Sequence, residues 1–302
     1  MHETAVTRML GIRYPIIAAP MFLISNEAMV VAVGEAGGLG SMPALNWRTT
    51  DAFREAVRTI KSRTEAPFGV NLIMLNNDRL LADLEVCLEE RVPLIITSLG
   101  NPTELIKAAH ARGIKVFCDV VNLRHAQKAE AAGADAVIAV SAGAGGHAGA
   151  ISPFVLVPYL RQHLSIPVIA AGGISNGAGV AGALALGAGA AYMGTRFIAS
   201  TESPAEEGFK AMILSAQPED IVYTPEVTGH PANFLKDSLE TFRAIKAQSE
   251  TEAKRWRDCW SAGQGVGLIS AIKPCGEIVS ELMREYEAAR SGLPAFDATS
   301  RV

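Results

Sequence analysis

The chain has 302 residues, of which 49% are hydrophobic and 19% charged, which excludes a mainly disordered protein and suffices for one large barrel or two ordinary domains. Its 27 Lys and Arg against 31 Asp and Glu residues give a formal net charge of −4, and without a basic run nucleic acid is not an expected partner. Four cysteines without metal-ligand spacing predict no metal site. With an N-terminus that lacks the apolar run of a signal peptide, they indicate a cytoplasmic protein.

Eight short apolar runs, rich in β-branched residues, recur along the first two-thirds of the chain. They are 16–21, 39–44, 68–74, 93–99, 115–121, 136–142, 167–173 and 190–197. Helical patterns such as 51–63, 79–90 and 102–113 lie between them, and such crossovers make neighbouring strands parallel. Eight strand–helix units predict a closed (β/α)8 TIM barrel. The alternative is an open doubly wound sheet, but its G-x-G-x-x-G turn is missing after the first run, which ends in Ala18-Ala19-Pro20-Met21.

One long stretch, from 162 to 195, contains no charged side chain. Pro167 and eight glycines would interrupt a membrane-spanning helix there several times. Strands covered by helices on both faces have the same apolar composition. No membrane segment is therefore expected.

The composition changes after about residue 203. We expect 203–215 to be the last barrel helix, so that residues 1–215 form the barrel and 216–302 a smaller, mostly helical cap. Within the cap, 277–290 has an amphipathic helical pattern. The apolar segment 264–269 and the tryptophans Trp256 and Trp260 are expected to fold over the barrel mouth.

Chemistry in such barrels lies at the carboxyl ends of the strands. The seventh run ends in Gly172-Gly173 and the eighth in Gly194-Thr195, so both present backbone N–H groups that lead into helices. Such ends attract phosphate. The alternative interpretation is that the glycines only permit tight turns.

The sixth run leads into a loop, 143–149, with four glycines around His147. Glycines let the backbone approach a flat ligand, and a histidine beside it is a ready acid or base near neutral pH. Asn71 and Asp119 are polar residues inside apolar strands, so each either braces the barrel wall or contacts a ligand. The remaining histidines are expected to have no role, and they are His2, His110, His125, His163 and His230.

Taken in order, these motifs resemble those of the nitronate monooxygenase family, formerly 2-nitropropane dioxygenases, which includes FMN-dependent enoyl reductases. The motifs are Ala19-Pro20-Met21, Gly69-Val70-Asn71-Leu72, Gly145-Gly146-His147-Ala148-Gly149, Ala171-Gly172-Gly173-Ile174, Met193-Gly194-Thr195-Arg196-Phe197, Thr228-Gly229-His230-Pro231-Ala232 and Ala262-Gly263-Gln264-Gly265-Val266-Gly267-Leu268-Ile269. They run from about residue 9 to 290. Three positions depart from the family pattern: Gly143 stands for a glutamate, Val140 for a glutamine and His230 for an arginine.

The resemblance implies an FMN barrel with His147 as the catalytic residue. It places backbone at Pro20 and Met21 beside the flavin ring, Asn71 at the ring edge, and the phosphate at the two glycine loops. The expected cofactor-binding residues are Ala19, Pro20, Met21, Asn71, Asp119, Ala142, Gly145, Gly146, Gly172, Gly173, Gly194, Thr195 and Gln264.

The leading hypothesis for function is FMN-dependent oxidation of alkyl nitronates, or of nitroalkanes, by O2. The second is an NAD(P)H-dependent FMN reductase that acts on a quinone or an enoyl thioester. A flavin-free aldolase, isomerase or binding barrel is disfavoured because no lysine lies at a predicted strand end. The sequence is compatible with an oligomer.

Overall fold

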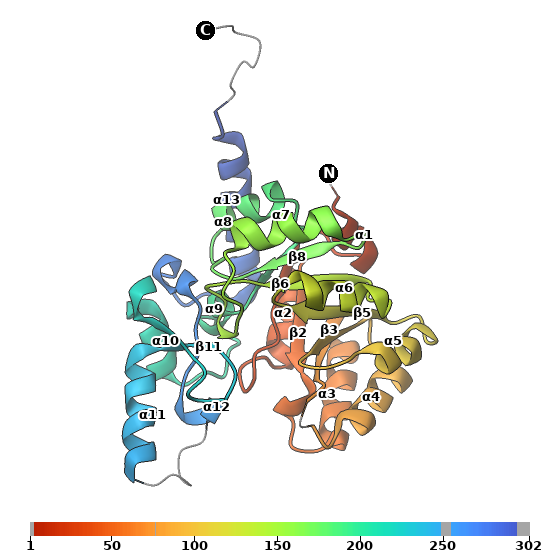
Figure 1. Ribbon diagram of the computed structural model, residues 1–302, viewed down its shortest axis with the longest axis horizontal. Coiled ribbons are helices and arrows are strands. Elements are labelled where there is room, and N and C mark those ends of the chain that lie inside the picture. Colours follow the sequence, from red (N-terminus) through yellow and green to blue (C-terminus); the bar gives the residue numbers. More distant parts are fainter. Residues whose placement is uncertain (1–2, 76, 249–254, 295–302) are drawn as a thin grey trace, which may run out of the picture.

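The computed structural model describes residues 3–75, 77–248 and 255–294. Eight parallel strands close into a barrel in the order β1-β2-β3-β4-β5-β6-β8-β9 (Figure 1). They are β1 (Ile16–Ala18), β2 (Leu39–Pro43), β3 (Phe68–Ile73), β4 (Leu94–Ser98), β5 (Lys115–Val120), β6 (Ala136–Val140), β8 (Val168–Ala171) and β9 (Ala191–Met193). Every expected run contains one of them, and the (β/α)8 TIM barrel is confirmed.

Helices surround the strands and begin where the sequence supplies capping side chains. The side chains of Asn26, Thr49, Asn122 and Asn176 each accept a hydrogen bond from a backbone N–H in the first turn of the helix that follows. The helices in the first two-thirds of the chain are α1 (Ala5–Leu10), α2 (Glu27–Glu35), η1 (Ala44–Asn46), α3 (Thr50–Arg63), α4 (Leu80–Glu89), α5 (Thr103–His110), α6 (Leu123–Ala131), α7 (Pro153–His163), α8 (Gly177–Ala185) and α9 (Thr195–Ile198).

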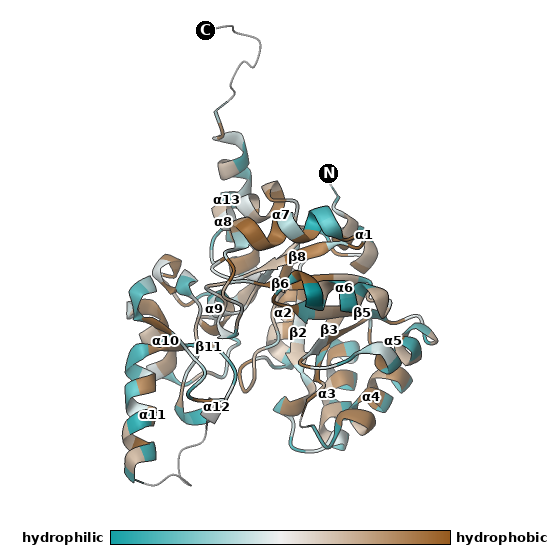
Figure 2. Ribbon diagram, viewed as in Figure 1, coloured by the Kyte–Doolittle hydropathy of each residue, from teal (hydrophilic) through white to brown (hydrophobic). Residues whose placement is uncertain are grey.

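The barrel interior is a packed core and not a channel. Ile17, Leu39, Ile96, Phe117 and Ile138 are fully buried inside it. A second apolar layer lies between the strands and the helices, whose outer faces carry both hydrophilic and hydrophobic residues (Figure 2). Towards the carboxyl ends of the strands the interior residues become polar.

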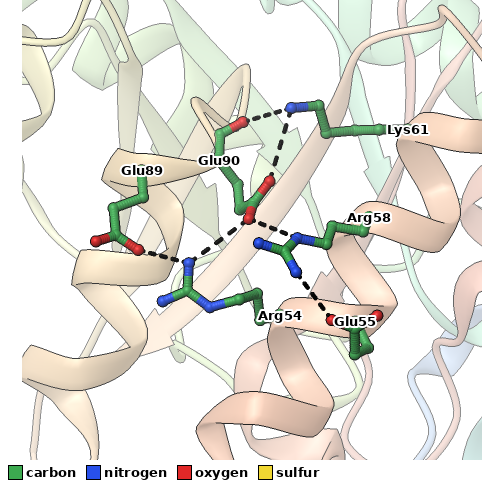
Figure 3. Close-up of polar contacts among 6 residues, drawn as sticks. All are labelled: Arg54, Glu55, Arg58, Lys61, Glu89 and Glu90. Carbon is green, nitrogen blue, oxygen red and sulfur yellow. Dashed lines mark hydrogen bonds and ion pairs between the residues drawn. The ribbon is translucent and has the colours of Figure 1, made fainter.

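The outer surface of α3 and α4 carries a network of ion pairs. Glu90 accepts a hydrogen bond from Arg58 and lies within ion-pair distance of Arg54 and Lys61, while Arg54 also pairs with Glu89 (Figure 3). These side chains are partly exposed, from 14% for Glu90 to 53% for Arg58, and they join two helices that are neighbours in the ring.

The C-terminal third covers one side of the barrel mouth and also completes the helix ring. Its elements are α10 (Glu207–Ser215), η2 (Pro218–Asp220), β10 (Ile221–Thr224), β11 (Ala232–Leu235), α11 (Lys236–Gln248), α12 (Arg255–Asp258), η3 (Gln264–Leu268) and α13 (Cys275–Ser291). Helix α13 packs against α8 and α2, so it, and not the segment 203–215, takes the last place in the ring (Figure 1). Helix α10 packs instead against α9 and η3. The sequence pattern had identified α13 as a helix but not its place.

Two short strands in this third were not expected from the sequence. β10 and β11 form an antiparallel sheet with β7 (Gly146–His147), which belongs to the loop after β6. The uncharged stretch 162–195 folds into β8, α8 and β9. No helix in the described part of the chain is long and apolar enough to cross a membrane.

Candidate active site

A cavity of about 1390 Å³ opens at the carboxyl ends of the barrel strands. Twelve of the fourteen residues expected at the site line this cavity. Ser98, Tyr192, His230 and Trp260 line it too. The expected residues found in its lining are Ala19, Pro20, Met21, Asn71, Asp119, Gly145, Gly146, His147, Gly172, Gly173, Gly194 and Thr195.

Two expected residues, Ala142 and Gln264, do not line the cavity and lie behind its wall. The backbone N–H of Ala142 donates to Ile151 O (2.8 Å), and that of Gln264 donates to Gly143 O (2.9 Å). Gly143 has φ +82°, and a Cβ there would lie 2.9 Å from Gln264 Oε1. A glutamate at position 143 would therefore be strained and crowded in this chain.

The loop after β8 forms an open backbone cradle in the cavity wall. Gly173 has φ +70°, which glycine adopts without strain, and no atom lies within 4 Å of the position a Cβ would take. Ser175 Oγ is buried and has no hydrogen-bond partner among the described residues. Gly194 and Thr195 line the same cavity. Open space, accessible backbone N–H groups and an unused hydroxyl are the features that an anionic group such as phosphate requires.

His147 is held in place by the C-terminal third of the chain. It lies in β7, opposite Ala232 of β11. Asn233 of β11 donates from Nδ2 to Ala144 O (2.7 Å), and the hydroxyl of Tyr223 in β10 donates to Ala148 O (3.0 Å). The loop is thus held in place by hydrogen bonds both before and after His147 in the chain.

The environment of His147 favours the neutral imidazole. Its pKa is lowered, first by burial and second by the charge of His230. The two rings lie edge to face with centroids 6.0 Å apart. His147 Nε2 lies 3.3 Å from Thr228 Oγ1, and that hydroxyl donates its own proton to His230 O (2.9 Å). Thr228 therefore accepts from an Nε2–H, and a neutral ring retains one basic nitrogen.

His230 was expected to have no role, but the structure places it at the candidate site. It lines the cavity beside His147, although 83 positions separate the two in the sequence. His125 lines the cavity as well. Only the pairing of β11 with β7 brings the 228–232 segment to the histidine, and no local pattern around residue 230 shows this pairing.

Polar side chains form the floor of the cavity at the tops of β3, β4 and β5. Asn71 donates from Nδ2 to Ser98 Oγ (2.8 Å), and Ser98 donates to Asp119 Oδ2 (2.5 Å). Burial raises the pKa of Asp119 to about 6, although the Ser98 hydrogen bond opposes the shift. Asn71 and Asp119 thus brace the barrel wall through Ser98, which the sequence did not single out, and both also line the cavity.

The loop after β1 is rigidly built where it borders the cavity. Asn46 accepts from the N–H of Leu23 (2.9 Å) and donates from Nδ2 to the carbonyls of Met21 (3.1 Å) and Ser25 (2.7 Å). These bonds hold Leu23 at φ 63°, a conformation rare for a leucine. Phe22 and Leu23 are both exposed and line the cavity.

The C-terminal tail reaches the cavity at two of the expected positions, Trp260 and, from the segment 264–269, Gly265. Trp260 lines the cavity and stacks on Phe209, with centroids 5.0 Å apart and an interplanar angle of 9°. Gly263 donates its N–H to Thr195 Oγ1 (2.9 Å), and Gly263 and Gly265 line the cavity. Trp256 lies in α12, but its side chain is outside the described part of the structure.

The residues present fit FMN. The cavity exceeds the ~300–1,000 Å³ typical of a site for one small ligand, so it has room for a cofactor together with a substrate. The cradle at Gly173 and Ser175 provides one phosphate-sized site, and the Asn71 side chain presents an amide to the same cavity. The sequence has a G-x-G-x-x-G stretch at 177–182, but it lies within α8 and none of its residues lines the cavity, so it gives no second phosphate site there.

The fold and this site define a barrel enzyme, and comparison with known proteins identifies its family. The model of the nitronate monooxygenase family matches residues 3–84 and 78–285. Nitronate monooxygenase of Paraburkholderia phytofirmans is 30% identical over 97% of this chain and 98% of its own length. The chain belongs to the nitronate monooxygenase family and is a flavin-dependent oxidoreductase.

Two further proteins are similar over most of the chain. FabK from Thermotoga maritima superposes with a TM-score of 0.88 at 36% identity, covering 96% of this chain and 98% of its own. The (3aS,4S,5R,7aS)-5-hydroxy-7a-methyl-1-oxo-octahydro-1H-indene-4-carboxyl-CoA dehydrogenase of Rhodococcus jostii is 32% identical over 78% of this chain and 67% of its own length. Proteins named for different substrates thus share this barrel.

Proposed function

We propose that the chain binds FMN in the cavity and oxidises alkyl nitronates with O2, in the cytoplasm. The observation that carries the proposal is His147, an imidazole that burial favours in its neutral form and that a strand of the tail fixes in the same cavity as the glycine cradle. FMN, when bound, supplies the redox chemistry by taking electrons from the substrate and passing them to O2.

The cofactor would be held mostly by backbone. Gly172, Gly173 and Ser175, with Gly194 and Thr195, would bind its phosphate, while Pro20, Met21 and Asn71 would border the ring. Asn71 is suited to this because the floor hydrogen bonds orient its amide. Ala142 and Gln264 would act behind the wall, since they support the loop 143–147.

His147 would move the substrate proton. Because its pKa is lowered, the ring is neutral at pH 7 and can accept the α-proton of a neutral nitroalkane, which leaves a nitronate and an imidazolium. The base role is therefore favoured over the alternative in which a resident imidazolium stabilises the anionic nitro group. A preformed nitronate needs no proton removal, so His147 matters less for it.

The cofactor proposal is tested at Gly194. A Cβ there would lie in ordinary contact, 3.5 Å from Met21 Sδ, so Gly194→Ala should keep the flavin. Gly194→Glu brings a carboxylate to the phosphate site and should abolish binding through like-charge repulsion. Flavin absorbance after purification measures both, and heat-released flavin should run as FMN on chromatography. Release of FAD, or a colourless wild-type protein, would contradict the proposal.

The second candidate is an NAD(P)H-dependent reductase acting on a quinone or an enoyl thioester. The observation in its favour is the large cavity with Phe22, Leu23 and Trp260 at its mouth, which suits a substrate with a long apolar part. A relative named for a carboxyl-CoA substrate points to the same chemistry. Anaerobic mixing with NADH or NADPH separates the candidates, because fast bleaching of the flavin without nitronate oxidation in air would favour the reductase.

A further inference from the structure

The floor of the cavity contains a carboxylate whose two oxygens differ in their surroundings. Asp119 Oδ2 accepts the hydrogen bond from Ser98. Oδ1 is shielded from solvent and has no hydrogen-bond partner among the described residues. Buried carboxylate oxygens are rarely left unpaired in native proteins, so this one calls for a physical explanation.

The groups around Asp119 do not neutralise its charge. They are Ser98 on β4, which accepts a hydrogen bond from Asn71 of β3, the phenol of Tyr192 on β9 and the apolar Val140 on β6. The Cys118 thiol is next to it in the chain and is engaged with Thr97 Oγ1 (3.2 Å). Burial and the Ser98 hydroxyl account for its pKa of about 6, and no cation contributes. The carboxyl can therefore change its protonation state within the ordinary working range of an enzyme.

Asp119 also lines the cavity in which FMN is proposed to bind. Charge close to a flavin tunes its electronics, and two like charges inside one low-dielectric cavity repel each other strongly. Two-electron reduction of FMN with one proton leaves one negative charge on the cofactor. This negative charge raises the proton affinity of a carboxylate on the cavity floor.

We propose that Asp119 is a redox-linked proton acceptor, which takes up a proton on Oδ1 when the cofactor is reduced and releases it on reoxidation. Two electrons and one proton enter the cofactor, and a second proton passes from solvent to the carboxylate, so that the net charge of the cavity is unchanged. The assignment rests on the proposed function, because it requires FMN in this cavity. Asp119 lies on β5, the neighbour of the strand β6 that carries Val140. Relatives have a polar glutamine at the position of Val140, and in this chain Asp119 supplies a polar group one strand away.

The test is the pH dependence of the FMN midpoint potential in the loaded protein. Each proton taken up per two electrons changes the equilibrium tenfold per pH unit, or about 30 mV. Between about pH 6 and the higher pKa that Asp119 has when the cofactor is reduced, the wild type should take up two protons, about 60 mV per pH unit, and Asp119→Asn only one. Asp51→Asn removes an equal charge from the exposed start of α3 and should behave as the wild type.

A second variant keeps the test decisive if Asp119→Asn fails to fold. Ser98→Ala removes the hydrogen bond that lowers the Asp119 pKa, so the steep region should begin at a higher pH than in the wild type. Equal slopes in the wild type and Asp119→Asn, or an unmoved region in Ser98→Ala, would overturn the assignment while leaving FMN binding intact. A wild-type protein that binds no FMN would overturn the proposed function and this assignment together.

Discussion

Two aspartates at opposite ends of the same barrel wall have opposite electrostatic environments. Asp135, just before β6, accepts hydrogen bonds from Lys115 Nζ (2.9 Å) and the N–H of Val116 (2.9 Å) and pairs with His110 Nε2 (2.8 Å). Its pKa is lowered, since these partners outweigh the opposing effect of burial. Asp119, near the end of β5, has one partner and a raised pKa.

The difference shows how the barrel separates stability from chemistry. At the amino end of the strands a carboxylate is fully paired and ties β5 to the start of β6. At the carboxyl end a carboxylate is left half-paired beside a cavity, and the surrounding fold has to stabilise it. Substitutions at the two ends should therefore have different consequences, with loss of activity at one and loss of stability at the other.

The largest effect is expected at the chemical end, for His147→Ala. Turnover should fall by about 10²–10⁴-fold, as is typical for loss of a positioned base, and the loss should be greater for neutral nitroalkanes than for preformed nitronates. FMN absorbance and the free energy of unfolding should change little. His163→Ala, on the last turn of α7, is the matched control and should have normal turnover. Wild-type rates in His147→Ala for both substrates would make this histidine a bystander.

At the amino end, Asp135→Asn should cost stability and leave the chemistry unchanged. The loss should be roughly 3 kcal/mol at pH 7, because charge-assisted hydrogen bonds are lost together. Since the folded-state pKa lies below 3.8, the carboxylate contributes stability above that pH, and the deficit should shrink only as the pH falls below about 4. Urea denaturation at several pH values measures this. A variant with normal stability but lower turnover would break the comparison.

In the cofactor-free protein, Asp119→Asn should change the free energy of unfolding in the opposite direction and stabilise the fold. The folded-state pKa is raised from 3.8 to about 6, so the ionised carboxylate costs stability at high pH and the neutral form does not. The variant should be more stable than the wild type by on the order of 2 kcal/mol at pH 8, with the gain fading between pH 6 and 4. A pH-independent difference in the urea midpoint would show that packing, and not charge, is responsible.

The sequence was enough to predict the barrel but not the whole site. Each apolar run was long enough to form one strand, and the order of the runs left few topologies. Local sequence could not reveal that α13 closes the ring, because an amphipathic helix does not specify which helices it packs against. His230 and Ser98 were missed for a related reason, since each acquires its role from a partner on another strand.

The smallest effect is expected on the outer surface, where Glu90→Gln alters the ion-pair network of α3 and α4 (Figure 3). Although Glu90 faces three cations, their side chains are partly solvated, and exposed pairs contribute no more than about 1 kcal/mol. Salt screens such charges, so the difference in unfolding free energy should diminish between 0.05 M and about 1 M NaCl, where the Debye length is roughly 3 Å. Turnover and FMN content should match the wild type. A salt-independent loss as large as that of Asp135→Asn would mean that the surface network stabilises the barrel as strongly as the hydrogen bonds of Asp135 do.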